Sequence, residues 1–430
     1  MFRTHTCGEL TKHNAGQTVK LSGWLESLRV QGKIGFLLLK DITGITQIFL
    51  TPMLTAALKE ATRESIITIE GTVNIRPANQ VRNDIPTGEI EVMATTAEIT
   101  NLAETPLPIE VDEVITTHLD KRLDYRFLDM HRKRTQSIFK IQNVIAHAFR
   151  EYFYQHDYIE MQPPCIISAA SEGGTDLFTV KYFEKMAYLA QSPQLYKQML
   201  ACSMGKTVTI TPVWRAEKHN TPRHINEIRQ MDIEVAFMNQ MDIMQEQEHC
   251  IKFIISKVLE HCSTELDFLD LKNLKIPTGV YLHYDDALKK INGTPGEDLT
   301  PEQERQLCAL YPGDLIFVHS WPAKIKPFYI MPKDQNAEAE YSEGFDALYG
   351  GMEISSGGQR IHLPELLIKR IKMKGLNPAS FQTYINSFRY GAPPHSGWSI
   401  GLERITQIIC GLDNIKEATM FPRDRDRLTP

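Results

Sequence analysis

Apolar and polar residues alternate along much of the first hundred positions. The apolar positions are Val19, Leu21 and Leu25, then Ile67, Ile69, Val73 and Ile75, then Ile90 and Val92. A period of two is typical of strands that bury one face, and the segments KDITG and IPTG between them are typical of turns. The pattern therefore predicts a small antiparallel β-barrel near the N-terminus.

Beyond the barrel the apolar period changes from two to that of a helix. The segment NLAETPLPIEVDE, residues 101–113, holds two prolines and four acids, which is typical of a linker. Apolar residues then recur at helical spacing: Ile138, Ile141, Ile145, Phe149 and Tyr152. We expect an amphipathic helix over residues 134–155 and a second one in NQMDIMQEQEHCIKFIISKVLEHC.

The C-terminal half mixes further helix and strand signals. Thr300, Pro301 and Gln303 form a capping box with proline at the first helical position, which predicts a helix start. The stretches LIFVHSW and PFYIM are strand-like. These alternations predict a mixed α/β domain over residues 134–430, joined to the barrel of residues 1–100 by a linker or hinge at residues 101–133.

Length and composition narrow the class of protein. A chain of 430 residues suits two or three domains, and a net charge of −6 argues against indiscriminate nucleic-acid binding while leaving room for a local basic groove. No apolar run approaches the length of a membrane span and no secretory signal is recognisable, so we expect no membrane association and a cytoplasmic location. The seven cysteines are scattered without a C-x-x-C pair, which predicts reduced thiols rather than a zinc site.

The predicted barrel carries a set of residues suited to single-stranded nucleic acid. They are Trp24, Arg29, Lys33, Phe36, Gln47, Arg76 and Arg82. Aromatic rings stack on splayed bases, while cations and amides hydrogen-bond to base edges and phosphates. An alternative stays open at this point, in which Trp24 and Phe36 belong to the core and the arginines are merely solvated.

A dense polar run separates two strand-like stretches in TPVWRAEKHNTPRHINEIRQMDIEVAF, residues 211–237. Its charged and titratable members are Arg215, Glu217, Lys218, His219, Arg223, His224, Glu227 and Arg229. If VTITPVW and QMDIEVAF pair as antiparallel strands, the run is a long connecting loop whose guanidinium groups can converge on a polyphosphate. A simply solvated loop is the alternative.

The segment AQSPQLYKQML predicts a helix start with a cation close to it. Ser192 can cap a helix whose first residue is Pro193, which places Lys197 early in that helix. A cation there lies at the positive end of the helix dipole and requires an anionic partner. An ordinary surface lysine is the alternative.

Two glycine-rich segments complete the candidate chemistry. In GFDALYGGMEISSGGQRIH, the oxygens of Asp346, Glu353 and Ser356 are of the kind that Mg²⁺ prefers. In YGAPPHSGWSIGLERI, Gly401 permits close backbone approach to a ligand, and Arg404 adds positive charge at a helix start. Structural turns are the alternative for both segments.

Taken together and in this order, the segments resemble the class II aminoacyl-tRNA synthetases, in particular the aspartyl branch of compact archaeal and eukaryotic-like enzymes. DYIEMQPPCI, with Pro164, resembles the family's first motif, WRAEKHNTPRHINE its second, GLERI its third, and MFPRDRDRLTP its C-terminus. The resemblance implies an α+β fold. An N-terminal OB-fold anticodon-binding barrel would precede a class II catalytic domain, an antiparallel sheet flanked by helices.

The same resemblance implies an activity and its partners. The enzyme would activate L-aspartate with ATP to aspartyl-adenylate and transfer it to the 3′ end of tRNA-Asp, with Mg²⁺ as cofactor. The first motif of the family forms a homodimer interface.

The resemblance also assigns roles to individual residues. The implied ATP-binding residues are Arg215, Glu217, Arg223, His224, Glu353, Gly401 and Arg404, with Arg215 and Arg404 as the catalytic pair. The implied aspartate-binding residues are Glu172, Ser192, Gln194, Lys197, Asp232, Ser356 and Arg360. The implied Mg²⁺ ligands are Glu353, Ser356 and Asp346, and the implied anticodon contacts are Arg29, Phe36, Gln47 and Arg76.

Several positions separate this chain from neighbouring branches. Lysyl enzymes need acidic recognition of their substrate, and asparaginyl enzymes lack the lysine of SPQLYK, so Lys197 and Arg360 favour aspartate. Ile228 replaces a phenylalanine that stacks on adenine in many relatives, and Ser399 replaces a common glycine. Glu26 stands where enzymes strict for tRNA-Asp carry tryptophan and relaxed ones histidine, so charging of tRNA-Asn stays open.

Two other functions are alternatives to the aspartate ligase. A non-catalytic paralogue that binds tRNA or a regulatory partner usually loses motif arginines, but Arg215, Arg360 and Arg404 are present. An ammonia-using asparagine synthetase resembles only the catalytic domain and would leave the barrel unexplained.

Overall fold

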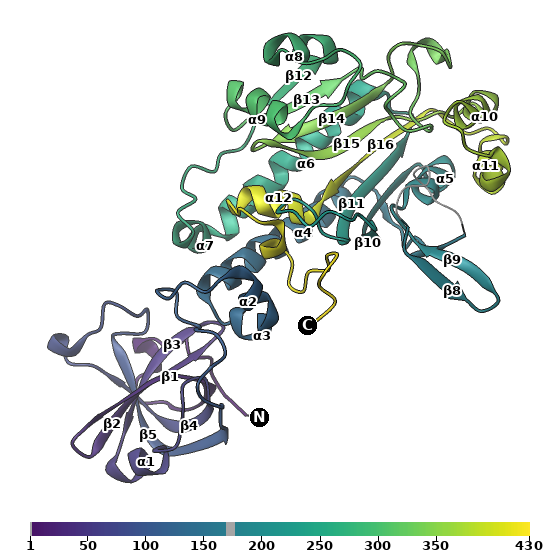
Figure 1. The fold of residues 1–430 in the computed structure, drawn as a ribbon. Helices are drawn as coiled ribbons and strands as arrows, with labels where there is room; N and C mark the ends of the chain where they lie inside the picture. The colour runs from purple at the N-terminus through teal and green to yellow at the C-terminus, as the bar shows by residue number, and fades with distance from the viewer. Residues whose placement is uncertain (1, 169–176) are drawn as a thin grey trace. The chain divides into compact units, whose positions relative to one another are not determined.

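The computed structural model describes residues 2–168 and 177–430, which form two compact units (Figure 1). The first unit ends at Glu110 and the second begins at Val111, so the division falls inside the predicted linker of residues 101–133. Whether that segment works as a hinge stays a prediction. Glu172, an implied aspartate-binding residue, lies outside the described residues.

The first unit is a closed barrel of five strands in the order β1-β2-β3-β5-β4. The strands are β1 (Thr18–Gln31), β2 (Ile34–Asp41), β3 (Gly44–Leu50), β4 (Ile66–Ile75) and β5 (Ile90–Asn101), with a short helix α1 (Pro52–Ala57) after β3. On β4 the alternate residues Ile67, Ile69 and Val73 are buried, whereas Ile75 at the strand end is exposed. The predicted barrel is confirmed, except that β3 and β5 pair in parallel.

The second unit is built on an eight-stranded sheet in the order β12-β13-β14-β15-β16-β11-β10-β6. Its strands are β6 (Ile159–Glu160), β10 (Lys206–Trp214), β11 (Glu227–Ala236), β12 (Gly279–His283), β13 (Leu315–His319), β14 (Gly344–Tyr349), β15 (Met352–Gln359) and β16 (His395–Gly401). Neighbouring strands are antiparallel apart from the two outermost pairs, which are parallel. A separate small sheet contains β7 (Ile166–Ile167), β8 (Thr179–Tyr182) and β9 (Lys185–Leu189).

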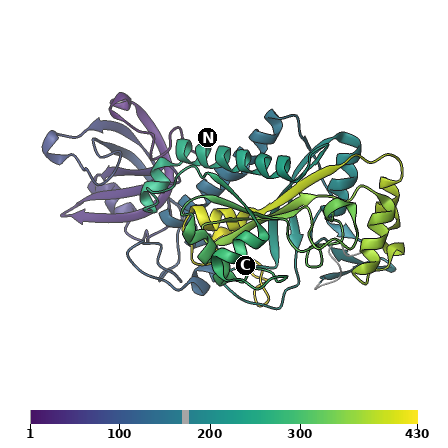
Figure 2. The ribbon, with the colours of Figure 1, turned by 90° about the horizontal axis from the view of Figure 1, so that it is seen from above.

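Helices surround this sheet, and the two longest lie along one of its faces (Figure 2). The helices are α2 (Leu119–Asp124), α3 (Arg126–Asp129), α4 (Lys133–Gln155), α5 (Gln194–Met204), α6 (Gln240–His261), α7 (Ser263–Phe268), α8 (Tyr284–Ile291), α9 (Pro301–Leu310), α10 (Pro364–Met373), α11 (Gln382–Phe388) and α12 (Leu402–Ile409). Phe149 of α4, Ile251 of α6 and Trp398 of β16 share the main apolar core. On the opposite face, α8 and α9 pack over Ile316, Val318 and Leu348, and the neighbouring strands β15, β16 and β11 remain available for a site.

Local sequence signals explain most element boundaries. The helix predicted over residues 134–155 is α4, and α9 begins at the predicted capping box, where the Thr300 hydroxyl accepts a bond from the Gln303 amide at 3.3 Å. The strand predicted at PFYIM is wrong. Residues 327–331 form a largely buried irregular segment with a turn from Pro327 to Ile330 and an isolated bridge from Ile330 to Arg360, so their apolar character reflects burial more than sheet pairing.

Two structural findings concern the cysteines and the apolar segments. All seven cysteines lie in the described part of the chain and are free thiols. Within residues 2–168 and 177–430, no helix is both long enough and apolar enough to cross a membrane.

Candidate active site

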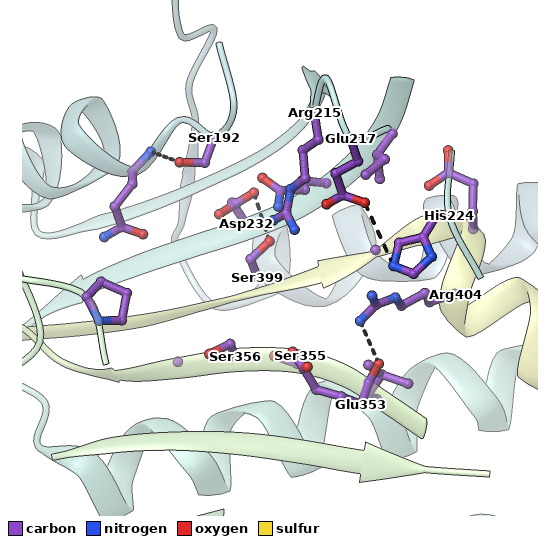
Figure 3. A pocket seen from close by; sticks show the side chains of 18 of the residues that line it. Ser192, Arg215, Glu217, His224, Asp232, Glu353, Ser355, Ser356, Ser399 and Arg404 are labelled. Atoms are coloured by element: carbon purple, nitrogen blue, oxygen red, sulfur yellow. Dashed lines mark hydrogen bonds and ion pairs between the residues drawn. The ribbon is translucent and has the colours of Figure 1, made fainter. Parts of the chain in front are cut away.

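A cavity of about 230 Å³ in the second unit brings together the four chemical segments of the catalytic half (Figure 3). Its lining includes Ser192 and Gln194, then Arg215, Glu217, Arg223 and His224, then Glu353, Ser356 and Arg360, then Gly401 and Arg404. These residues are separated by up to about two hundred positions in the chain. Their convergence argues against the alternatives in which each segment is a solvated loop or a structural turn.

Strand register explains why polar groups meet on one face of the sheet. Asp232 on β11 lies opposite Ser399 on β16, Ser399 lies opposite Ser356 on β15, and Ser356 lies opposite Asp346 on β14. Side chains of directly opposed residues point to the same face. Four strands therefore present one polar row beneath the cavity.

The loop of residues 215–226 joins β10 to β11, as the predicted hairpin requires. The Asn226 side-chain amide donates to the carbonyls of Arg215 and Glu217 at 2.6 and 3.0 Å and closes the base of the loop. Farther out, His224 Nε2 lies 3.8 Å from a Glu217 carboxylate oxygen. Burial lowers the pKa of His224, although the charge of Glu217 opposes this shift.

Arg404, at the start of α12, faces the hairpin loop across the cavity. Its Nη1 donates to the main-chain carbonyl of Glu353 at 2.9 Å (Figure 3). Glu353 is half-buried, and loss of solvation together with the charge of Asp346 raises the pKa of its carboxyl to about 7. We call Arg215, Glu217, Arg223, His224, Glu353 and Arg404 the loop end of the cavity.

The other end, which we call the strand end, consists of Lys197, Asp232, Glu234 and Arg360. Lys197 Nζ donates to Asp232 at 2.8 Å and lies 3.5 Å from Glu234, while Arg360 Nε donates to Glu234 at 2.8 Å. The two predicted cations therefore meet, and the group that joins them is a carboxylate. Arg360 lines the cavity, whereas Lys197 is only 1% exposed and lies behind the lining.

Glu234 was not among the predicted site residues. The alternation of polar and apolar residues in QMDIEVAF could have identified Glu234. Gln230, Asp232 and Glu234 share one face of β11, and apolar residues occupy the other. Room for its carboxylate comes from Gly397 on the neighbouring strand, where an added Cβ would lie 2.1 Å from Glu234 Oε2. Burial by itself would raise the pKa of Glu234, but Arg360 and Lys197 outweigh it and lower that pKa.

Two further predicted residues lie next to this group. Ser192 does not bond as a conventional N-cap, because α5 begins at Gln194 and Pro193 occupies the cap position. The Ser192 hydroxyl nevertheless accepts a bond from the Gln194 amide at 3.4 Å. Ser399, which departs from the family pattern, donates to Asp232 at 3.3 Å.

Of the groups proposed for Mg²⁺, Glu353 belongs to the loop end, and Asp346 and Ser356 belong to the polar row beneath the cavity. Asp346 accepts a hydrogen bond from the Ser356 hydroxyl at 2.6 Å and forms an ion pair with Lys326, a residue that the sequence analysis missed. In the described chain, no three His, Cys, Asp or Glu side chains are grouped as a protein-only metal cage. Glu353 and the neighbouring Asp346 fit a Mg²⁺ ion that takes its other ligands from phosphate and water.

The candidate nucleic-acid surface lies on the first unit. Arg29, Phe36, Gln47 and Arg76 line one cavity of about 380 Å³, so Phe36 is not part of the barrel core. Gln47 is oriented from both sides: its oxygen accepts from Arg82 at 3.2 Å and its nitrogen donates to Glu91 at 3.3 Å. Arg76 is largely buried and donates to the Ile90 carbonyl, which also gives it a structural role.

Comparison with known families agrees with this arrangement. The model of tRNA synthetases class II (D, K and N) matches residues 118–425. The chain belongs to this family. A second model, for an OB-fold nucleic acid binding domain, matches residues 19–100, and together the two matches confirm the predicted fold.

Individual relatives place this class II synthetase more narrowly. An aspartate–tRNA(Asp/Asn) ligase from Methanosphaera stadtmanae is 41% identical, with 100% of this chain and 98% of the relative covered. An aspartate–tRNA(Asp) ligase from Thermococcus kodakarensis is also 41% identical, with 100% of each covered. The crystal structure of asparaginyl-tRNA synthetase from Pyrococcus horikoshii with asparaginyl-adenylate has a TM-score of 0.91 at 31% identity, covering 100% of both chains.

Proposed function

We propose that this synthetase is an aspartate tRNA ligase. The observation that carries the proposal is the meeting of Lys197 and Arg360 at Glu234, beside a cavity that also contains Arg215 and Arg404. An acidic amino acid at the strand end and ATP at the loop end would each find groups of opposite charge. The chain would thus activate aspartate with ATP and transfer it to tRNA.

The first chemical step requires positioning and charge neutralisation more than proton transfer. The α-carboxylate of aspartate is already a nucleophile and would attack the α-phosphorus of ATP in line, with pyrophosphate as the leaving group. Arg215 and Arg404 would hold the α- and γ-phosphates and stabilise the charge that develops on them. Glu217 would accept a hydrogen bond from the adenine amino group, and His224 would contact the γ-phosphate.

Glu353, Ser356 and Asp346 would hold Mg²⁺, which would supply positive charge next to the phosphates when bound. The Ser356 hydroxyl already donates to Asp346, and Lys326 already pairs with that acid. Glu353, whose carboxyl has no such cation bonded to it in the described chain, is therefore the best suited of the three to hold the ion.

The strand end would select aspartate over asparagine. Arg360 uses Nε and Nη2 on Glu234, and within the described chain its Nη1 makes no hydrogen bond, so this nitrogen is available to a substrate carboxylate. Lys197 supplies the second positive charge from behind. An amide would present no negative charge to Arg360 Nη1, and sites built to bond one group of a substrate discriminate against an analogue that lacks it by about 10⁴-fold.

In the second step, the transfer of aspartate to tRNA, the barrel surface would bind the tRNA. The chain would also form a homodimer. Phe36 and Gln47 are suited to stack on and read single-stranded bases of the anticodon. The tRNA would be tRNA-Asp, and a tRNA substrate would place the activity in the cytoplasm. A homodimer would form through the first-motif segment, where the edge strand β6 exposes Ile159.

Glu26 marks the position that separates strict from relaxed relatives by resemblance. In this chain its carboxylate pairs with Lys40 at 2.7 Å and with Arg63 at 3.2 Å, on the barrel. A carboxylate held by two ion pairs has no aromatic ring like that of the tryptophan or histidine found at this position in the relatives. The position therefore does not decide whether tRNA-Asn is charged, and the experiment below measures charging of both tRNAs.

The test is aspartate-dependent exchange of pyrophosphate into ATP, followed by charging of tRNA-Asp and tRNA-Asn transcripts side by side. We expect exchange with aspartate, none with asparagine, and charging of tRNA-Asp. Binding of tRNA without any exchange would instead identify a non-catalytic paralogue. Exchange that prefers asparagine would overturn the role of Lys197 and Arg360.

A further inference from the structure

The hairpin loop of residues 215–226 is bonded to a segment far away in the chain. The Ile415 amide donates to the Pro222 carbonyl at 2.8 Å, and the Asn226 amide donates to the Arg423 carbonyl at 2.7 Å. The Arg425 guanidinium adds a bond to the Lys218 carbonyl at 3.1 Å. Residues 414–427, which lie close to the C-terminus, thus contact the loop at several points along its length.

Asn220 has the central position in this contact. Its side-chain oxygen accepts a hydrogen bond from Lys416 Nζ at 2.8 Å, and its side-chain nitrogen donates to Asp426 at 2.7 Å. One amide therefore joins the tip of the loop to both ends of the C-terminal segment. Bonds to charged partners are stronger than those between neutral groups, and Lys416 is itself buried.

The C-terminal segment is itself held in a defined conformation. Asp424 pairs with Lys416 at 2.6 Å and accepts bonds from the main-chain amides of Asp426 and Arg427 at 2.8 and 3.0 Å. Asn414 caps the short helical turn Ile415–Ala418 by accepting a bond from the Lys416 amide. The segment can therefore act as a fixed support for the loop.

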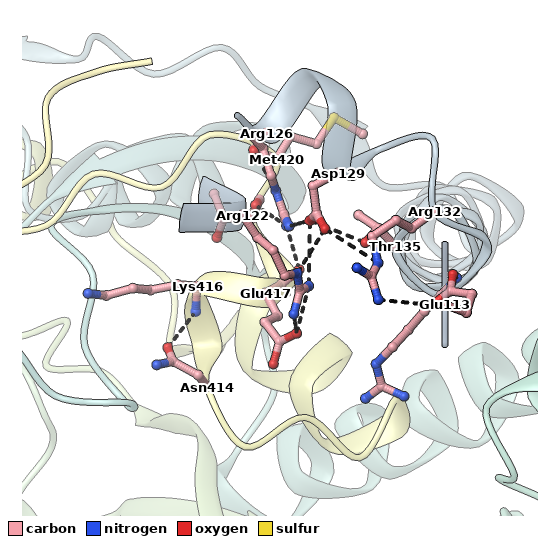
Figure 4. A network of polar contacts seen from close by, with 12 residues as sticks. Glu113, Arg122, Arg126, Asp129, Arg132, Thr135, Asn414, Lys416, Glu417 and Met420 are labelled. Atoms are coloured by element: carbon pink, nitrogen blue, oxygen red, sulfur yellow. Dashed lines mark hydrogen bonds and ion pairs between the residues drawn. The ribbon is translucent and has the colours of Figure 1, made fainter. Parts of the chain in front are cut away.

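A buried polar network anchors this support to the body of the second unit (Figure 4). Arg126 is fully buried and donates to the carbonyls of Glu417 and Thr419, each at 3.0 Å. Arg122 pairs with the Glu417 carboxylate at 3.1 Å and with Asp129 at 2.8 Å. Hydrogen bonds and ion pairs thus connect helices α2 and α3 to the C-terminal segment, and that segment to the hairpin loop.

We propose that residues 414–427 are a clasp that positions the hairpin loop, and that Asn220 is its principal positioning residue. The inference rests on the proposed function, because Glu217, Arg223 and His224 reach the cavity from this loop. A loop tethered only at its base would lose conformational entropy on binding ATP, and the clasp removes part of that loss in advance. The groups of the strand end come from α5, from β11 and from Arg360 directly after β15, so their positions do not depend on the clasp.

The test is a series of variants assayed by aspartate-dependent pyrophosphate exchange. Asn220→Ala removes both side-chain bonds and should raise the KM for ATP about tenfold, the effect of losing a hydrogen bond to a charged group, while the KM for aspartate changes less than about twofold. Asn220→Asp keeps an acceptor for Lys416 but places a second carboxylate next to Asp426, and the two carboxylates repel each other. The double variant Asn220→Asp with Asp426→Asn restores a donor and an acceptor, and should recover most of the ATP affinity.

Asn273→Ala is the matched control, since Asn273 is exposed and no hydrogen bond of its side chain occurs in the described chain. Amide hydrogen exchange of residues 215–226 is a measurement that needs no activity. These amides should exchange faster in the Asn220→Ala variant than in the Asn273→Ala variant. Equal rises in KM for ATP and aspartate, or unchanged loop exchange, would overturn the clasp. A wild-type chain without aspartate-dependent exchange would instead overturn the proposed function, while loop exchange would still decide on the clasp.

Discussion

The strand end and the loop end of the cavity are built in opposite ways. At the strand end, the four charged groups of Lys197, Asp232, Glu234 and Arg360 are each at most 2% exposed and are held by regular elements. At the loop end, the side chains of Glu217 and His224 are 30% and 37% exposed and belong to an irregular loop. One end is preorganised by ion pairs inside the protein, and the other depends on support from a distant segment.

This difference follows from what each end would bind. A small amino acid must be distinguished by one functional group, and buried charges respond strongly to a wrong partner because water does not compensate them. A triphosphate carries several charges, so even partly solvated cations bind it effectively. Changes at the strand end should therefore alter selectivity and stability together, whereas changes at the loop end should alter turnover with the fold intact.

Glu234→Ala should produce the largest effect and test the first half of this comparison. Removal of the carboxylate leaves Lys197 and Arg360 buried without their shared partner, and the free energy of unfolding should fall by about 3–5 kcal/mol. Urea unfolding of the variant measures the loss. Glu227→Ala, on the same strand but paired with the partly exposed Arg229, should cost less than about 1 kcal/mol, and similar losses in both would contradict the special role of the buried acid.

Arg404→Ala should show the opposite behaviour at the loop end. Arg404 bonds to a main-chain carbonyl rather than to a buried charge, so the unfolding transition should move little. Adenylate formation should fall about 10³-fold, since an arginine directed at developing phosphate charge contributes at least that much. Pyrophosphate exchange measures the rate, with the exposed Arg305→Ala as control, and near-normal exchange would count against the third-motif assignment.

Local patterns were sufficient to predict several elements of both units. The period-two alternation around Ile67 predicted the barrel, and the capping box at Thr300 predicted a helix start, because both signals lie within a few residues. The hairpin that contains Arg215 was predicted for the same reason. PFYIM shows the limit: a short apolar stretch is compatible with a buried irregular segment as well as with a strand.

Pairings across the fold were beyond what the sequence alone could supply. The ion pair of Lys326 with Asp346 and the bond between Asn220 and Asp426 join residues whose separations follow no local period. Lys197 illustrates the intermediate case. Its place in the helix predicted the need for an anion, but only the structure identifies Asp232 and Glu234 as the groups that meet it.

Lys197→Met should separate the two ends kinetically. The change keeps the length of the side chain and removes the charge, so Asp232 loses its ion-pair partner and the substrate carboxylate loses one cation. The KM for aspartate should rise about 100-fold, while the KM for ATP should change less than about threefold. Steady-state exchange with each substrate varied in turn measures both, with Lys206→Met as control, and equal losses for the two substrates would refute a role in binding aspartate.

Ser399→Gly should have the smallest effect and the sharpest meaning. The change restores the residue common in the family and removes only the 3.3 Å bond from the Ser399 hydroxyl to Asp232, whose other oxygen still accepts from Lys197. The KM for aspartate should rise about two- to fivefold, the range expected for one neutral donor, and the KM for ATP should not change.

Ser396→Gly on the same strand is the control, because its hydroxyl bonds to the Met238 carbonyl instead. Both variants should lose some stability from glycine in a strand, so a rise in KM that occurs in both would trace to β16 as a whole. A rise confined to Ser399→Gly would show that even a single hydroxyl contributes to the preorganisation of the strand end.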